Sequence, residues 1–194
     1  MKNLIVFVFA LHASSIFSQN DSISILFYNV ENLFDTQDDS LKNDNEFLPN
    51  SKKKWTSTRW NQKTVNIAKV IAGNNFPEII GLCEIENKAV LNKIKNHYIL
   101  KSKKYSIIHF ESPDLRGIDC ALLYQSDKID LLSMRANNVD LQGRKTRDIL
   151  SATFANAKDT FAVFVNHWPS RYGGRKKSNP KRKIASERLL FLMD

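Results

Sequence analysis

The stretch IIGLCEIEN, residues 79–87, decides the fold because it places an acid at the end of an otherwise apolar strand. Residues 78–85 are predicted to form a strand that is too hydrophobic to lie on the surface. Glu84 ends this strand, and a buried ionised carboxylate needs a compensating partner. That partner is either a basic side chain or a hard divalent cation such as Mg²⁺, which proteins hold through few carboxylates, waters and substrate phosphate.

The segments on either side of this strand alternate between helical and extended patterns. Upstream, residues 22–28 alternate around Ile23, Ile25 and Phe27, which predicts a strand with that face buried. A long loop is expected at 35–60, then a helix over 61–72 that Gly73 ends. Downstream, a helix is predicted over 89–98, strands over 105–110, 118–124, 129–134, 149–154 and 161–165, and a helix from 181 onward. This order predicts a mixed α/β domain with helices packed outside the sheets.

The N-terminus is predicted to be a signal peptide. Lys2 precedes the uncharged apolar run 4–11, and small residues up to Ser18 precede a polar segment. A membrane anchor is the alternative, but the run is too short to span a bilayer of roughly 30 Å. We therefore expect a signal peptide at 1–19 and a domain at 20–194 that is exported, periplasmic or secreted, without stable membrane insertion.

Composition and charge set wider bounds. The 194 residues are 42% hydrophobic and 25% charged, as in an ordinary folded domain. Cys83 and Cys120 lie in apolar stretches and are interpreted as buried core residues rather than a disulfide, and the cysteines and histidines lack zinc-ligand spacing. The net charge is +9, and residues 171–183 carry seven positive charges and no acid. This basic stretch is either a solvated loop or a surface that attracts phosphate.

Polar side chains also follow other predicted strands. In YNVENLFD, residues 28–35, Asn29 and Glu31 are two apart and would share one face of an extended chain, although an Asn-stabilised turn would also explain the asparagine. In SPDLRGIDCALLY, residues 112–124, Gly117 allows Arg116 to approach a phosphate closely. Asp119, which is charged among apolar neighbours, either binds substrate or pairs with an arginine, for which Arg116 and Arg147 are candidates.

The last such segment is VNHWPSRYGG, residues 165–174, which follows TRDIL, residues 146–150, on the neighbouring predicted strand. His167 stands at a strand end before a turn rich in glycine and basic residues. Histidine can hold or give a proton near neutral pH and can bind a phosphate oxygen. A lone histidine there would be structural, so the other strand-end segments favour the functional interpretation.

These five segments, in this order and at these separations, resemble successive motifs of the endonuclease/exonuclease/phosphatase superfamily, with its secreted bacterial members as the nearest type. The resemblance implies a four-layered α/β/β/α sandwich with mixed sheets and a site at one edge of the sheets. It also implies that the C-terminal portion of the domain is missing, so that the chain is an N-terminal fragment.

The resemblance further implies roles for individual residues. Asn29 would bind phosphate and steady the metal site, Glu84 would ligate Mg²⁺, with Mn²⁺ or Ca²⁺ as alternatives, and Glu31 would add a contact beside the metal. His167 would contact the scissile phosphate and assist departure of the leaving group. The residues placed near the substrate are Arg147, Arg116, Ser170 and Arg171.

The implied reaction is metal-assisted attack of water on phosphorus in a nucleic acid or other phosphodiester, as in an exported nuclease. The family's Gly-Asp-Phe-Asn-like motif and its final Asp-His pair, which orient and activate water, have no match in this sequence. The chain alone is therefore expected to be inactive. The alternatives are a non-catalytic relative that binds polyanions, and a phosphodiesterase or phosphatase acting on phospholipid or sugar phosphate.

Overall fold

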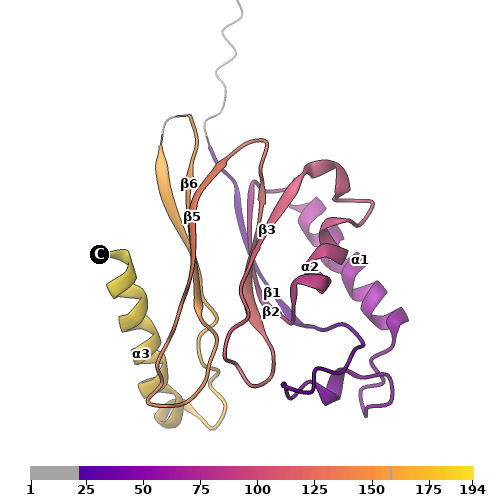
Figure 1. Ribbon diagram of the computed structural model, residues 1–194, viewed down its shortest axis with the longest axis vertical. Helices are drawn as coiled ribbons and strands as arrows, with labels where there is room; N and C mark the ends of the chain where they lie inside the picture. The colour runs from indigo at the N-terminus through magenta and orange to yellow at the C-terminus, as the bar shows by residue number, and fades with distance from the viewer. Residues whose placement is uncertain (1–21, 158) are drawn as a thin grey trace, which may run out of the picture.

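Two β-sheets lie face to face between outer helices (Figure 1). The computed structural model describes residues 22–157 and 159–194, so the predicted signal peptide lies outside the described residues. The larger sheet has the order β1-β2-β4-β3, with β1 parallel to β2 and the other pairs antiparallel. Its strands are β1 (Ile25–Leu33), β2 (Ile79–Ile85), β3 (Tyr105–His109) and β4 (Asp119–Gln125). The smaller sheet is antiparallel, in the order β5 (Asp130–Asn137), β6 (Ile149–Ala155) and β7 (Thr160–Val165).

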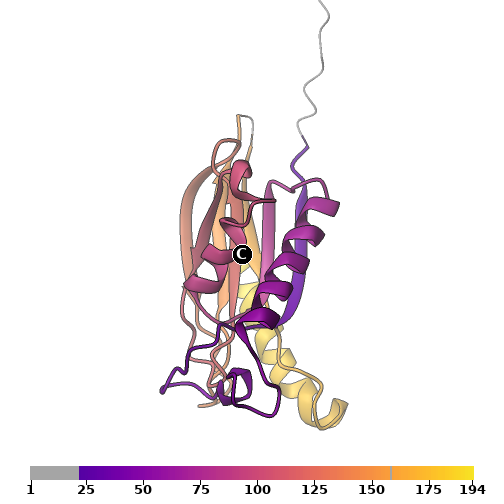
Figure 2. The ribbon, with the colours of Figure 1, turned by 90° about the vertical axis from the view of Figure 1, so that its right-hand side faces the viewer.

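The helices form the two outer layers, which are seen from a second side in Figure 2. Helices α1 (Ser57–Gly73) and α2 (Lys88–Lys95) cover the larger sheet, and α3 (Arg175–Met193) covers the smaller one. Two short 3-10 turns, η1 (Asn45–Phe47) and η2 (Lys101–Lys103), lie in the connections. The arrangement confirms the predicted four-layered sandwich. Both sheets were expected to be mixed, but only the larger one is, since the described strands of the smaller sheet are all antiparallel.

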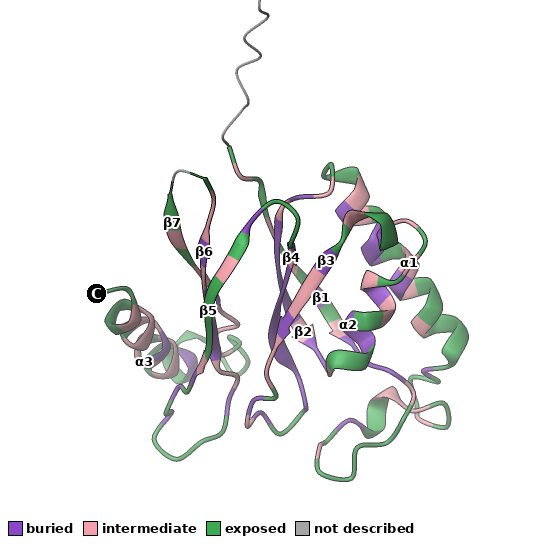
Figure 3. Cartoon of the chain, turned by 45° about the horizontal axis from the view of Figure 1, so that its top comes forward, coloured by how far each residue is buried: buried purple, intermediate pink, exposed green. Residues whose placement is uncertain are grey.

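Apolar residues at helical and strand spacing build the core, which Figure 3 shows as buried segments between the layers. Ile67, Ala68 and Ile71 of α1 recur at helical spacing and pack against the larger sheet. Between the sheets, Leu122 of β4 and Phe154 of β6 belong to one buried cluster, and both are fully buried. Because both faces of β2 are covered, its continuous apolar run is that of an interior strand.

The buried face of β1 is the opposite of the predicted one. Ile25 and Phe27 are 57% and 58% exposed, whereas Val30, on the helix side, is buried. β1 is an edge strand of its sheet, and β7, the edge strand of the other, packs against β2 and β4. Nothing in the described part of the chain therefore covers the inner face of β1, and two large side chains remain exposed there.

Two helix boundaries also differ from the prediction. α1 begins at Ser57, so the predicted loop over 35–60 includes its first turn. α3 begins at Arg175 and continues through Pro180, whereas the sequence placed its start just after this proline. Among the described residues, none of the helices is both long and apolar enough to cross a bilayer. Cys83 and Cys120 are buried, as predicted, and their thiols form a hydrogen bond at 3.8 Å in place of a disulfide.

Candidate functional site

Glu84 leaves the end of β2 through an irregular backbone. The β2–β4 pairing matches Cys83 with Cys120 and Ile85 with Asp119, which leaves Glu84 out of register. Its φ angle of 66° lies in the left-handed region, which costs a non-glycine residue free energy on the order of 1–3 kcal/mol. Such bulges re-aim a side chain at the rim of a sheet. The apolar strand on one side and Ile85 on the other hold the strained residue in place.

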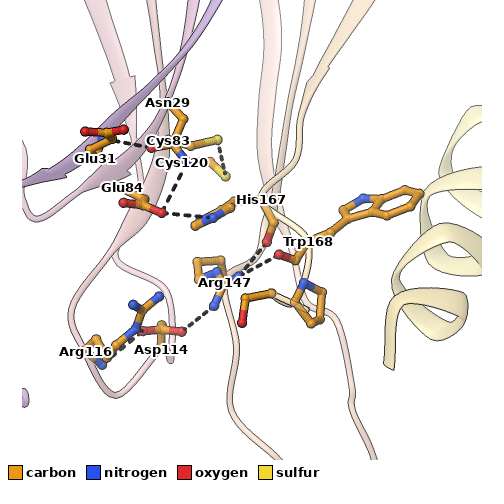
Figure 4. Close-up of polar contacts among 12 residues, drawn as sticks. Asn29, Glu31, Cys83, Glu84, Asp114, Arg116, Cys120, Arg147, His167 and Trp168 are labelled. Carbon is orange, nitrogen blue, oxygen red and sulfur yellow. Dashed lines mark hydrogen bonds and ion pairs between the residues drawn. The ribbon is translucent and has the colours of Figure 1, made fainter. Parts of the chain in front are cut away.

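Asn29 of β1 and His167, just after β7, converge on the same oxygen of Glu84 (Figure 4). Asn29 Nδ2 donates to Glu84 Oε1 at 3.2 Å, and His167 Nε2 lies 3.3 Å from that atom. The side chains of Glu84 and His167 are only 15% and 17% exposed. One sheet supplies the carboxylate and the amide, and the other supplies the imidazole, so the site depends on the packing of the two sheets.

This arrangement keeps the Glu84 carboxylate ionised. The hydrogen bond from His167, together with the bond from Asn29 and the positive charge of Arg116, outweighs burial and lowers the pKa of Glu84 to about 2. His167 Nδ1 is buried and has no hydrogen-bond partner among the described residues. The site therefore presents a negative carboxylate beside an imidazole that has one ring nitrogen unused.

Arg147 holds the segment that carries the histidine. Its Nη1 donates to Asp114 Oδ2 at 3.0 Å, and its Nη2 donates to the carbonyl oxygens of His167 at 2.9 Å and Trp168 at 3.1 Å. The arginine side chain is 9% exposed. Arg147 thus joins the loop between β3 and β4 to the loop after β7, and its observed contacts are those of a positioning residue (Figure 4).

A cleft of about 430 Å³ opens over Glu84 and His167. Its walls come from the loop before β6, the loop after β7 and the first turns of α3. The basic residues that line it are Arg116, Arg144, Lys145, Arg147, Lys177 and Lys181. Because these cations surround one carboxylate, the cleft can attract a polyanion while keeping a place for a metal ion.

The structure brings most of the predicted site residues together. Glu84, His167, Arg116, Arg147 and Ser170 line this cleft. Asn29 joins them through its hydrogen bond to Glu84.

Three predicted site residues lie elsewhere. Glu31 does not share a face with Asn29, because Glu31 has a φ angle of 55° and the β1–β2 register shifts after Asn29. The Glu31 backbone N–H donates to Asn29 Oδ1 at 2.8 Å, and Glu31 lines a separate pocket with Arg59 and Lys63. Arg171 donates to Asn179 Oδ1 at 2.9 Å and does not line the cleft.

Asp119 is the third of these residues. It is fully buried, and its neighbours are the Ser112 backbone N–H, 2.9 Å from Oδ1, and His109 Nε2, 3.2 Å from Oδ2. The predicted pairing of Asp119 with Arg116 or Arg147 is wrong, because Asp114 takes both arginines.

The sequence did not point to several residues of the site, including Arg144 and Lys145 of the cleft wall. Asp114 was overlooked as the acid that pairs with Arg147, since nothing in its local pattern shows which arginine it meets. Lys177 and Lys181 stand out in the sequence only as part of the basic stretch 171–183. Because they are four residues apart on α3, they face the cleft together, a spacing that would have pointed to them had the helix been predicted to start at Arg175.

Two sheets packed between helices, with a carboxylate, an amide and an imidazole gathered at their edge, define a protein of the four-layered α/β sandwich class. The sequence model described as "Endonuclease/Exonuclease/phosphatase family" matches residues 24–194. The chain belongs to this family, and the resemblance seen in the five motifs is confirmed. No curated protein sequence matches the chain significantly.

Solved structures share the fold. The chain is similar to a humanized zebrafish (D. rerio) TDP2, with a TM-score of 0.56 and 15% identity over 87% of this chain and 54% of that one. It is also similar to the human Nocturnin catalytic domain with bound sulfate, with a TM-score of 0.59 and 16% identity over 88% and 57% of the two chains. ANGEL2, a 2′,3′-cyclic phosphatase, gives a TM-score of 0.58 and 16% identity over 83% and 44%. The chain spans about half the length of these proteins, and at such identities the likeness concerns the fold alone.

Proposed function

We propose that this chain is part of an exported, divalent-metal-dependent hydrolase of phosphodiester bonds that acts on nucleic acid. The observation that carries the proposal is the ionised Glu84, held by Asn29 and His167 at the base of a cleft lined by six basic side chains. A fixed negative site surrounded by fixed positive ones suits a metal ion and a phosphate bound side by side. Family membership supports the same chemistry.

The donors at Glu84 fit a hard cation. Oε1 is shared by Asn29 and His167, which leaves Oε2 without a hydrogen bond from another described residue. One carboxylate with waters and phosphate oxygens is a ligand set that Mg²⁺ accepts, and Mn²⁺ and Ca²⁺ are the alternatives. When bound, such a cation polarises a phosphate oxygen and neutralises charge on the leaving oxygen.

His167 and the basic residues act on the phosphate itself. A phosphate bound beside Glu84 lies within reach of the imidazole, which can donate a hydrogen bond to it or give a proton to the leaving oxygen as the new bond from water forms. The cleft cations, from Arg116 on one wall to Lys181 on the other, bind the phosphates on either side. Several phosphate contacts along one cleft favour a nucleic acid over a single phosphate group.

We further propose that residues outside this sequence complete the site by activating the water. The motifs that supply this step in the family have no match here, and the chain spans about half the length of the similar solved proteins. The exposed inner face of β1, with Ile25 and Phe27, is where additional strands of the smaller sheet would pack. On this proposal the 194-residue chain binds nucleic acid but does not turn it over.

Cleavage by the full-length protein tests the proposal. Plasmid DNA, RNA and bis-p-nitrophenyl phosphate are incubated with Mg²⁺ or with EDTA. Cleavage should need the metal, and Glu84→Gln and His167→Ala should each lower kcat/KM by about 10²–10⁴-fold. Glu187→Gln, an exposed acid on α3, is the matched control and should leave kcat/KM unchanged.

Other outcomes would exclude the proposal or change its substrate. Binding of DNA that weakens with salt, with no cleavage of any substrate by the full-length protein, would identify a polyanion-binding relative. Hydrolysis confined to phospholipid or sugar phosphate would retain the chemistry and remove nucleic acid as the substrate. Near-native kcat/KM in Glu84→Gln would remove this carboxylate from the site.

A further inference from the structure

A second group of metal-ligating side chains lies at the hairpin of β3 and β4. His109 ends β3, Asp119 begins β4, and Glu111 follows two residues after the histidine. One ligand atom from each of these side chains lies within 4.8 Å of the others. His109 pairs with Ala121 in the antiparallel ladder of β3 and β4. Continuing this register by two residues along each strand places Glu111 opposite Asp119 and on the same face as His109. Two carboxylates facing each other across strands repel unless a cation or a shared proton lies between them, and burial together with the charge of Asp119 raises the pKa of Glu111.

The buried atoms of this group lack hydrogen-bond partners. His109 Nε2 and Asp119 Oδ2 lie 3.2 Å apart, in side chains that are 3% and 1% exposed, but they are not aligned for a hydrogen bond with each other. Neither atom has another hydrogen-bond partner among the described residues. Two metal bonds of about 2.1 Å at 90–110° place their ligand atoms about 3.0–3.4 Å apart, so 3.2 Å is the separation expected for neighbouring ligands of one ion.

The surroundings give a cation a route to this group. Glu111 also lines an acidic pocket that contains six acidic side chains and one lysine, Lys42. These acidic side chains are Asp35, Asp38, Asp39, Asp44, Glu86 and Glu111. Burial raises the pKa of Glu86 to about 8, so this group adds little negative charge at neutral pH. Asp44 is 1% exposed, and its Oδ1 has no hydrogen-bond partner in the described part of the chain. In a protein with a net charge of +9, this pocket concentrates cations beside the hairpin.

We propose that His109, Glu111 and Asp119 bind a structural transition-metal ion of the Zn²⁺ class, separate from the catalytic cation at Glu84. An imidazole nitrogen with two carboxylates suits Zn²⁺ better than Mg²⁺ or Ca²⁺, which prefer oxygen alone. A water completes four-fold coordination on the side of the acidic pocket. Ser112, whose backbone N–H donates to Asp119 Oδ1 at 2.9 Å, orients the buried carboxylate.

A metal ion at this site would stabilise the loop between β3 and β4, which positions His167 through Asp114 and Arg147. Its ligands stand at both ends of the connection between β3 and β4, which contains Asp114. Asp114 in turn binds Arg147, which holds the His167 carbonyl. An ion at the hairpin therefore fixes the first link of a chain of contacts that ends in the cleft.

Metal content and affinity test the proposal in the full-length protein carrying Glu84→Gln, with excess Mg²⁺ present and Zn²⁺ as the probe. One tightly bound Zn²⁺ per chain is expected after dialysis, and X-ray absorption at the zinc edge should show imidazole scattering. Adding Glu111→Gln, an exposed change that leaves the core intact, should weaken Zn²⁺ binding by about 10-fold or more. Asp38→Asn, another exposed acid of the pocket, is the matched control and should change affinity by about twofold at most.

Several results would overturn the proposal. The first is that the Glu84→Gln protein retains no Zn²⁺, and the second is that Glu111→Gln leaves the Zn²⁺ affinity unchanged. The third is that Asp38→Asn lowers the Zn²⁺ affinity as much as Glu111→Gln does, which would show attraction by the acidic pocket without ligation. A zinc spectrum without imidazole would also exclude His109. Because all measurements use the Glu84→Gln protein and none depends on cleavage, their failure is distinct from failure of the proposed hydrolase.

Discussion

Replacing Arg147 by methionine removes the three hydrogen bonds that join the two loops beneath the cleft. The change keeps much of the side-chain volume and leaves Asp114, which is 6% exposed, with only the longer contact to the exposed Arg116, at 3.8 Å. Removing one partner of a buried ion pair lowers the free energy of unfolding by about 3–5 kcal/mol. The carbonyls of His167 and Trp168 also lose a donor, but water in the cleft can replace it in part. We therefore expect the free energy of unfolding to fall by about 3–4 kcal/mol.

The effect on catalysis separates positioning from substrate binding. If Arg147 acts by holding the His167 backbone, its loss displaces the imidazole and lowers kcat of the full-length protein by about 10²-fold while KM changes little. Arg147→Lys should recover part of the stability, since one ammonium can still reach Asp114. Urea denaturation and steady-state hydrolysis of a phosphodiester measure the two effects.

Controls make this reasoning refutable. Arg144→Met, a change at another basic residue of the same cleft, should alter the free energy of unfolding by about 0.5 kcal/mol or less. A double-mutant cycle with Asp114→Asn should give an interaction of about 1–3 kcal/mol with Arg147. Unchanged stability together with a raised KM in Arg147→Met would show that this arginine binds substrate directly, as the sequence suggested.

Two further predictions concern stability. Hydrogen bonds from Lys128 and from Ser24, the residue before β1, outweigh burial and lower the pKa of Glu78 to about 2. The stabilisation that Glu78 gives is therefore present above about pH 4.5 and lost as pH falls toward 2. Glu78→Gln should lower the free energy of unfolding at pH 7 by about 1–2 kcal/mol and have little effect near pH 2, as urea denaturation at each pH would show. A Cβ at Gly81 would lie 3.1 Å from Val165 Cγ2 between the sheets, so Gly81→Ala should destabilise by about 1–3 kcal/mol. At Gly73 a Cβ meets nothing within 4 Å, so Gly73→Ala should be neutral or stabilising. Thermal unfolding of both variants measures the difference, and equal effects at the two glycines would contradict the packing argument.

Local patterns were enough to find most elements of the fold. The strand over 78–85 and the later strands agree with the structure to within a few residues, because alternation and apolar runs report directly on burial. The error on β1 has a different origin. Both of its faces carry apolar side chains, so the pattern could not show which face has a covering layer.

The residues of the candidate site also divide into those that local patterns identify and those that only the fold brings together. The sequence by itself determined that Glu84 ends a buried strand and that His167 follows another, since a charge beside an apolar run is visible along the chain. Only the tertiary structure decided that Asn29 and His167 share one oxygen of Glu84, that Arg147 pairs with Asp114, and that Asp119 lies beside His109. The physical reason is that these contacts join residues far apart in the chain, across strands and between the two sheets. Their partners are set by strand register, by the left-handed backbone at Glu84 and by the packing of the two sheets. The residues adjacent in sequence do not determine any of these features.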